Sequence, residues 1–234
     1  EVVLADYTMV NADFPYAMTN LIPDEKQRGK YSNKYIDEME YSCSCFILYL
    51  GVDKKYPTEA AHTFHIAENF EKNIDDIFEA GLPPEDPSIY VFNVSQVQEN
   101  LSPEGMNALY VLVPVPDLSL YDEWTDENIQ NYREKILDLL SNIEPFEDLK
   151  QHIRYESIYT PKMFAENFNA YNGATFGLRP SLLQSAYFRP HNKFDYAENL
   201  YFCGSSIHPG AGVPTVLQSA KLSVEELLKD DKKG

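Results

Sequence analysis

The chain has 234 residues, of which 44% are hydrophobic and 24% are charged. This composition is typical of a folded protein with one large or two modest domains, and it excludes a disordered chain. Its 37 acidic and 19 basic residues give a net charge of −18, which argues against nucleic acid as a partner, because phosphate binding depends on clustered Lys and Arg. The longest nearly apolar run, residues 45–52, is much shorter than the roughly 20 residues of a membrane-spanning helix.

The first predicted elements are a strand and a connecting segment. Residues 2–10 alternate between polar and apolar side chains and then become apolar, which predicts a strand that leads into a turn at residues 11–15. Residues 22–38 are charged and contain Pro23 and Gly29, which is typical of a crossover between domains.

The middle of the chain predicts a sheet with helices on one side. Segments rich in Tyr, Phe, Val and Ile predict strands at residues 43–52, 61–66, 88–94, 108–115 and 152–158. One amphipathic helix is predicted over residues 69–80. A second begins with a Thr125 cap, has Asn128 at the third position, and continues with Ile129, Tyr132, Ile136, Leu139 and Leu140 at helical spacing. The alternation of elements predicts an α+β layer.

Metal-ligand and nucleophile patterns are weak. Cys43 and Cys45 lie on one face of a strand and could share a metal. No second ligand pair accompanies them, so the favoured interpretation is that they are small residues of the core. His62 and His65 point to opposite faces of a strand. We therefore expect no metal site, and the three cysteines indicate a reducing, cytoplasmic setting. No serine occurs in a G-x-S-x-G motif, so hydrolase chemistry is a poor fit.

The segment of residues 200–228 carries the main functional signal. An apolar strand at residues 200–203 precedes small residues, a glycine-rich loop at Gly210 and Gly212, and a helix that opens at Pro214. Small residues let a backbone approach a bulky anionic ligand, and a helix start offers unpaired N–H groups at the positive end of its dipole. Spacing alone fits a nucleotide or flavin loop and an ordinary tight turn equally well.

The whole segment closely resembles the C-terminal flavin-contacting segment of the bacterial carotenoid (phytoene-type) desaturases. The matching pattern is NLY-x-x-G-x-x-x-HPG-x-G-x-P-x-V-x-x-SAK, from Asn199 to Lys221. Segments at residues 11–15, 41–44, 86–91, 102–105, 110–116 and 174–177 resemble their counterparts in the same order. Within the family they are most similar to the dehydrosqualene (4,4'-diapophytoene) desaturases. The chain has no G-x-G-x-x-G turn for a cofactor pyrophosphate, so we expect it to be only the C-terminal half of such an enzyme.

The resemblance implies an α/β and α+β fold, the C-terminal part of a two-domain, FAD-dependent, amine-oxidase-like architecture. Residues 1–25 and 167–234 would form segments of a Rossmann-like FAD domain, and residues 26–166 a mixed-sheet substrate domain with flanking helices. The expected cofactor is FAD. The residues implied to contact it are Gly204, Ser205, His208, Gly210, Ala211, Gly212, Val213, Pro214 and Thr215. For His208 a loop-ordering hydrogen bond is the alternative, and the resemblance identifies no catalytic side chain.

The implied function is FAD-dependent desaturation of 4,4'-diapophytoene in carotenoid biosynthesis, by hydride transfer from an allylic carbon to flavin. The implied partners are a long apolar polyene and the missing N-terminal half, in a cytoplasmic location that allows peripheral contact with the membrane. The fragment alone is expected to be inactive. Aromatic residues within 164–176 and 187–194 could line a channel for the polyene or belong to the core. A carotenoid oxygenase or isomerase and a non-catalytic lipid-binding module are the alternatives.

Overall fold

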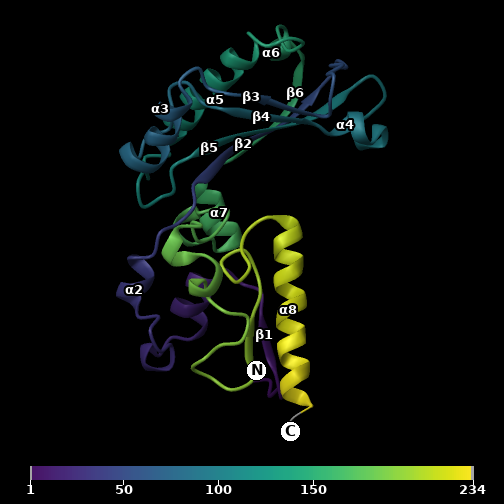
Figure 1. Ribbon diagram of the computed structural model, residues 1–234. Coiled ribbons are helices and arrows are strands. Elements are labelled where there is room, and N and C mark those ends of the chain that lie inside the picture. The colour runs from purple at the N-terminus through teal and green to yellow at the C-terminus, as the bar shows by residue number, and fades with distance from the viewer. Residues whose placement is uncertain (1, 233–234) are drawn as a thin grey trace. The chain divides into compact units, whose positions relative to one another are not determined.

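The computed structural model describes residues 2–232, and the chain forms two compact units (Figure 1). Unit 1 contains Glu1–Ser42 and Ala165–Gly234, and unit 2 is Cys43–Phe164. Residues 26–42, which were predicted to lie in the middle domain, cluster with unit 1 instead. Their side chains Tyr31, Ile36 and Met39 are buried in the core of that unit, which explains the different boundary.

Unit 2 is built on a five-stranded antiparallel sheet with the order β3-β4-β5-β2-β6. The strands are β2 (Ser44–Val52), β3 (His62–His65), β4 (Ile89–Asn93), β5 (Asn107–Val115) and β6 (Ile153–Tyr159). All five strands that the sequence predicts in this region are therefore confirmed. Long strands at the centre and a short strand at one edge agree with the lengths of the apolar segments.

Both predicted helices of unit 2 are present. Helix α5 (Asp126–Leu140) begins at Thr125, whose hydroxyl oxygen accepts a hydrogen bond from the backbone N–H of Asn128 at 3.2 Å. Helix α3 (Phe70–Asp75) is capped by Asn69 and continues as a π-helical turn over Asp76–Ala80. Three short helices were not predicted: α4 (Val94–Val97), α6 (Leu149–His152) and α7 (Pro161–Phe168). They are too short to show a helical period in the sequence.

The core of unit 2 lies between one face of the sheet and helices α5 and α6. Leu109, Val111 and Val113 alternate along β5 toward this core and are at most 2% exposed. Ile136 of α5 and Leu149 of α6 pack against them from the helical side. Burial of such side chains contributes about 1.5–3 kcal/mol each, so this layer stabilises the unit.

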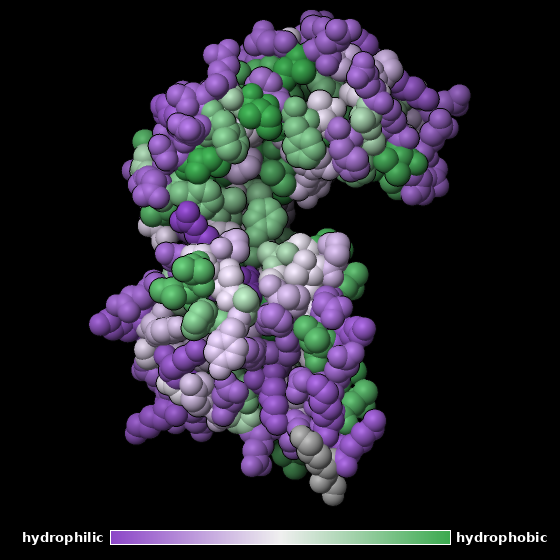
Figure 2. All heavy atoms as spheres, in the orientation of Figure 1, coloured by the Kyte–Doolittle hydropathy of each residue, from purple (hydrophilic) through white to green (hydrophobic). Residues whose placement is uncertain are grey.

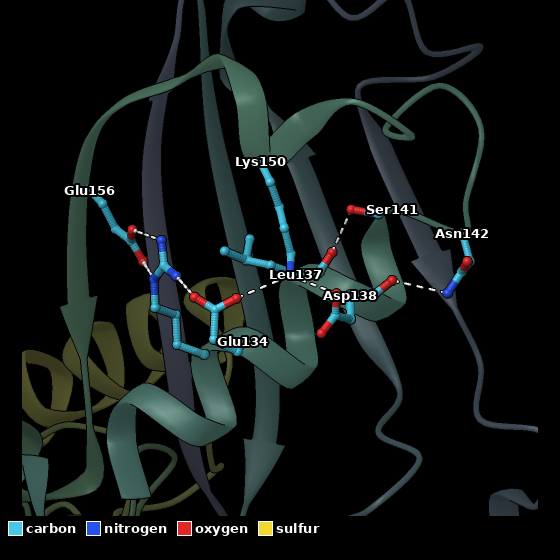
Figure 3. A network of polar contacts seen from close by, with 8 residues as sticks. Glu134, Leu137, Asp138, Ser141, Asn142, Lys150 and Glu156 are labelled. Carbon is cyan, nitrogen blue, oxygen red and sulfur yellow. Dashed lines mark hydrogen bonds and ion pairs between the residues drawn. The ribbon is translucent and has the colours of Figure 1, made fainter. Parts of the chain in front are cut away.

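Polar residues cover the outer side of α5 (Figure 3). The Arg133 guanidinium donates two hydrogen bonds of 2.6 Å to the Glu156 carboxylate of β6, which ties the helix to the edge of the sheet. Lys150 reaches Asp138 at 2.6 Å and Glu134 at 3.0 Å. Figure 2 shows the same tendency across the visible surface, where polar residues predominate and apolar side chains form separate patches.

A second ion-pair group of unit 2 makes its stability depend on pH. The hydrogen bond from Lys54 lowers the pKa of Asp148, and Tyr56 also donates to that carboxylate at 2.9 Å. A carboxylate whose pKa is lower in the folded state adds stability above its unfolded pKa, and this stability is lost as pH falls through the folded pKa. We expect Lys54→Met to lower the urea midpoint at neutral pH, and the difference from the unchanged chain to shrink as pH falls below 3.8, the ordinary pKa of an Asp carboxyl. A difference that stays constant as the carboxyl is protonated in acid would contradict this assignment.

Unit 1 contains a two-stranded parallel sheet and the last helix. Strand β1 (Thr8–Val10) pairs with β7 (Leu200–Phe202), and α8 (Val213–Asp231) runs beside them (Figure 1). The first strand is shorter than the predicted range of 2–10, because β7 pairs with only three of its residues. Two short helices, α1 (Phe14–Tyr16) and α2 (Asn33–Asp37), and a π-helical turn at Ala17–Leu21 complete the N-terminal part.

The two units together confirm the predicted fold class, since helices combine with a parallel sheet in one unit and an antiparallel sheet in the other. Within residues 2–232, no helix combines the length and the apolar character needed to cross a bilayer.

Candidate functional site

A pocket lies at the carboxyl ends of the two parallel strands of unit 1. Residues that follow β1 and residues that follow β7 meet there, as is usual for ligand sites in parallel sheets. The pocket has a volume of about 260 Å³. Its lining consists of Asn11, Ala12, Asp13, Phe14, Phe168, Ala170, Ala174, Thr175, Gly204, Ser205, Ser206, Ile207 and Val216.

Two glycines give the loop after β7 a shape that other residues rarely adopt. Gly204 has φ of 140° and Gly212 has φ of 98°, which disfavour any side chain. The space beside them is open, because the atoms nearest to an added Cβ would be Asn11 Nδ2 at 3.8 Å and Thr215 Oγ1 at 3.7 Å. The loop therefore offers bare backbone that a large ligand could approach closely.

Helix α8 starts directly after this loop. Gly212 is its N-cap residue and supplies no side-chain acceptor, and the first turn contains no acidic residue. Pro214 lies in the first turn, as predicted, one position after the helix begins at Val213. The N–H groups of a first helical turn have no partners inside the helix, and they carry the positive end of its dipole. This helix start is thus suited to negative charge.

Asp13 is the acidic group of the pocket. Its carboxylate accepts hydrogen bonds from the Tyr171 backbone N–H at 3.1 Å and from the Ser206 hydroxyl at 3.3 Å. Burial raises the pKa of Asp13, while these hydrogen bonds act in the opposite direction. Asn11 completes this side of the pocket by donating to the Cys203 carbonyl at 3.2 Å. The side chains after β1 thus hold the loop after β7 in place.

Thr175 lines the same pocket and has an unused polar atom. Its hydroxyl oxygen Oγ1 is inaccessible to solvent and has no hydrogen-bond partner among the residues that the structure describes. A buried hydroxyl without a partner costs about 1–3 kcal/mol, so groups of this kind commonly belong to ligand or water sites.

Arg189 lies beneath the loop and holds its backbone. Only 2% of this residue is exposed, and its guanidinium donates to the carbonyl oxygens of Leu178 at 3.1 Å and Ile207 at 3.3 Å. It also donates to the carbonyls of Gln184 and Ser205. Burial lowers the pKa of Arg189. A single buried cation therefore fixes the segment around residues 178–184 and the residues that lead into the glycine-rich loop.

Replacement of this cation is expected to be costly. Arg189→Met leaves four carbonyl oxygens without their donor, so we expect a loss of about 3 kcal/mol in the free energy of unfolding of unit 1, measured by urea titration with circular dichroism. The matched control is Arg154→Met, because the Arg154 side chain is 52% exposed where it pairs with Asp53 and donates to the carbonyl oxygens of Gln151 and Ile153. The control should cost less than about 1 kcal/mol. Equal effects of the two substitutions would show that Arg189 does not organise the loop.

A buried polar cluster connects the loop to α8. Asn192 donates to the carbonyl oxygens of His208 at 3.1 Å and Ser219 at 3.0 Å. Ser219 in turn accepts from the Gly204 backbone N–H at 3.3 Å, and Ser223 donates to the Phe202 carbonyl at 2.6 Å. The helix, the strand and the loop are therefore held in one arrangement.

The structure brings together only part of the predicted site. Gly204 and Ser205 line the pocket, whereas Gly212, Val213 and Pro214 lie exposed at the start of α8. The remaining predicted residues, which lie in the loop and the first turn, are His208, Gly210, Ala211 and Thr215. Nδ1 of His208 lies 3.3 Å from the Ala186 carbonyl oxygen, as expected for the loop-ordering alternative.

The sequence prediction did not include Asn11, Asp13, Thr175 or Arg189. The first two follow a predicted strand directly, and the rule for parallel sheets would have indicated them if the pairing of β1 with β7 had been known. No metal cluster of three or more His, Cys, Asp or Glu side chains occurs in the described range of 2–232.

Comparisons with known proteins confirm the resemblance that the sequence predicts. The chain is 42% identical over 233 residues to 4,4'-diapophytoene desaturase (4,4'-diaponeurosporene-forming) of Staphylococcus aureus strains Newman and USA300, a match that covers 98% of this chain and 46% of the relative. The chain thus spans about half the length of these relatives. A solved oxidoreductase structure from Methanosarcina mazei aligns with a TM-score of 0.49 and 16% identity, over 97% of this chain and 44% of that one. No protein-family model matches.

Proposed function

The chain is related to the bacterial 4,4'-diapophytoene desaturases over almost its whole length, and we propose that it is the C-terminal half of such an enzyme. The proposed activity of the complete protein is FAD-dependent desaturation of 4,4'-diapophytoene. The observation that supports this activity best is the glycine-rich loop, which lies at the carboxyl ends of two parallel strands and leads into an uncapped helix start. Under this proposal, unit 1 is part of an FAD domain and unit 2 is a substrate domain.

The residues around the loop fit a flavin. The backbone at Gly204 and Gly212 is open on the side where a Cβ would lie, so a flat ring system could approach it. Thr175 supplies an unused hydroxyl, and the first turn of α8 supplies N–H groups. We propose that Gly204, Ser205, Thr175 and the α8 start hold the flavin end of FAD. The other predicted loop residues, from His208 to Thr215, would shape this contact.

FAD bound here would supply a hydride acceptor for a reaction in which an allylic carbon of the substrate loses a hydride and the neighbouring carbon loses a proton. The chain's own contribution is electrostatic and geometric. The positive end of the α8 dipole favours negative charge near the loop, and Arg189 and Asn192 keep the backbone in one conformation. A fixed loop costs no reorganisation during the reaction, which is the property expected of a preorganised site.

The proposed substrate is a polyene without charged groups, so the proposed function needs no charged substrate site. The relatives' name specifies 4,4'-diapophytoene, a long hydrocarbon that offers no group for ionic recognition. We infer that the reaction takes place in the cytoplasm at the surface of the membrane that holds such a lipid. Binding of the hydrocarbon must then rely on apolar and aromatic surfaces.

A hybrid enzyme tests the proposal. In the hybrid, this chain replaces the matching part of the Staphylococcus aureus desaturase, and the gene is coexpressed with a dehydrosqualene synthase or, separately, with a phytoene synthase. We expect yellow-orange products from the thirty-carbon substrate. Some turnover of the forty-carbon substrate is compatible with this, because a length mismatch of a few methylenes is worth only about 1–3 kcal/mol.

Other products would point to the alternatives. Oxygenated or isomerised products alone would assign the chain to a carotenoid oxygenase or isomerase. A folded, flavin-containing hybrid without any conversion would favour a non-catalytic lipid-binding module. Activity on phytoene alone would keep the desaturase and refute the thirty-carbon substrate.

A further inference from the structure

The second face of the unit 2 sheet lies opposite helices α5 and α6, and it is exposed at Phe64 and Tyr49 but buried at Cys45 and Ile47. Along β5, Leu109 and Val111 are buried in the core, while Tyr110 and Leu112 point the other way and are half-buried. The same alternation holds in β4, where Tyr90 lies on the second face. In an antiparallel sheet, directly paired residues share a face, so the strand register identifies the whole surface.

Aromatic rings form a continuous ladder across this face. Phe64 of β3 contacts Tyr90 of β4 with ring centroids 4.9 Å apart, and Tyr90 contacts Tyr110 of β5 at 6.1 Å. Tyr110 contacts Tyr49 of β2 at 5.4 Å. The ladder therefore crosses four adjacent strands, a distance of about 14 Å at the usual strand spacing.

The second face carries no formal charge along the ladder. The paired side chains beside the ladder on β3, β4, β5 and β2 are His62, Phe92, Leu112, Ile47, Pro114 and Cys45. None of the residues that the register places on this part of the face is Asp, Glu, Lys or Arg, although 24% of the chain is charged. Such a surface favours a neutral, apolar ligand over an ionic one.

A pocket of about 340 Å³ lies at the β3 end of the ladder. Phe64, Tyr90, Leu112 and Pro114 line it together with Ile66. Tyr90 is held by His62, whose Nδ1 lies 2.7 Å from the tyrosine hydroxyl. His65 and Ser88 also line the pocket, so its lining is mostly apolar with a few polar side chains.

We propose that this aromatic face, defined as Tyr49, Phe64, Tyr90 and Tyr110 with the adjoining pocket, binds the polyene chain, with one end of the hydrocarbon in the pocket. This proposal rests on the proposed function for the identity of the ligand, since the relatives act on 4,4'-diapophytoene by name. A long unsaturated hydrocarbon packs its double bonds and methyl groups against aromatic rings, and it needs no ionic partner. The ladder arranges its aromatic rings in one line, which suits an extended ligand better than a compact one.

Pigment binding by the 234-residue chain tests the face without any flavin. The probe is 4,4'-diaponeurosporene dispersed in a non-ionic detergent, and the readout is the visible absorbance that co-elutes with the protein in size-exclusion chromatography. We expect Phe64→Glu and Tyr49→Glu each to reduce bound pigment at least tenfold, and Phe64→Ala about threefold. Phe64 and Tyr49 are 67% and 42% exposed, so the folded state should survive, which thermal unfolding monitors.

Phe70→Glu is the matched control, because Phe70 is 52% exposed on α3 and lies outside the aromatic face. It should leave pigment binding unchanged. Equal losses in the control, unchanged binding in Phe64→Glu, or absence of pigment from the unsubstituted chain would overturn the proposal. A dimer that Phe64→Glu dissociates without loss of pigment would assign the face to a second copy instead.

The hybrid enzyme separates failure of this inference from failure of the proposed function. Face-dependent pigment binding without any desaturation would refute the function and keep the binding face. Desaturation whose KM for 4,4'-diapophytoene is unaffected by Phe64→Glu would keep the function and refute the face. We expect the hybrid to desaturate 4,4'-diapophytoene, and we expect Phe64→Glu to raise its KM for this substrate at least tenfold.

Discussion

Gly212→Val is expected to remove the bound flavin from the hybrid desaturase while unit 2 stays folded. Gly212 has φ of 98°, a conformation in which a β-branched residue costs about 1–3 kcal/mol. The added side chain would also enter the open space beside the loop, where the proposed cofactor approaches the backbone. We expect flavin absorbance per protein to fall at least tenfold, measured on the purified hybrid.

Gly105→Val is the matched control for this substitution. Gly105 has φ of 79° and open space around it, but it lies in unit 2 between α4 and β5. It should show a comparable backbone penalty and normal flavin content. If Gly212→Val retained normal flavin and turnover, the loop would be an ordinary turn and the proposed site would be wrong.

The 234-residue chain alone is expected to bind FAD weakly. It has no G-x-G-x-x-G turn for the pyrophosphate, and the pocket beside the loop offers only about 260 Å³. The purified chain should therefore be colourless, and titration with FAD followed by flavin fluorescence should give a Kd above about 1 μM, weaker than roughly −8 kcal/mol. The hybrid should purify yellow. Stoichiometric yellow flavin on the chain alone would show that the loop and its pocket suffice.

Local patterns explain which elements the sequence predicts. Strands β4 and β5 of unit 2 alternate buried and half-buried residues over five or more positions, and Thr125 marks the start of α5. Strand β1 was predicted too long because its extent depends on a partner about 190 residues away. Short helices such as α2 and α6 depend on tertiary packing, which leaves no periodic signal in the sequence.

The sequence predicts those parts of the candidate site whose residues are adjacent in the chain. The glycines of the loop and Pro214 form a recognisable string, and the structure places the glycines between β7 and α8 and Pro214 in the first turn of α8. Asp13 and Arg189 act through contacts with residues 5 to 193 positions away. In the sequence, Arg189 does not differ from a surface arginine, so only the folded structure identifies its role.

The surface proposed to bind the polyene also depends on the folded structure. The aromatic residues within 164–176 and 187–194 are dense in the sequence, yet Phe194 belongs to the core of unit 1 and Tyr187 is 78% exposed. The aromatic ladder instead collects one ring from each of four strands, at Tyr49, Phe64, Tyr90 and Tyr110. Strand register, which the sequence does not state, creates that surface.

The most direct test of the central claim is a single-turnover experiment on the purified hybrid enzyme without oxygen. The hybrid is mixed with 4,4'-diapophytoene, and flavin absorbance and product are measured together. We expect oxidised flavin to bleach as the desaturated product appears, with one new double bond for each flavin reduced. Unchanged flavin absorbance in a folded hybrid that holds both flavin and substrate would contradict it.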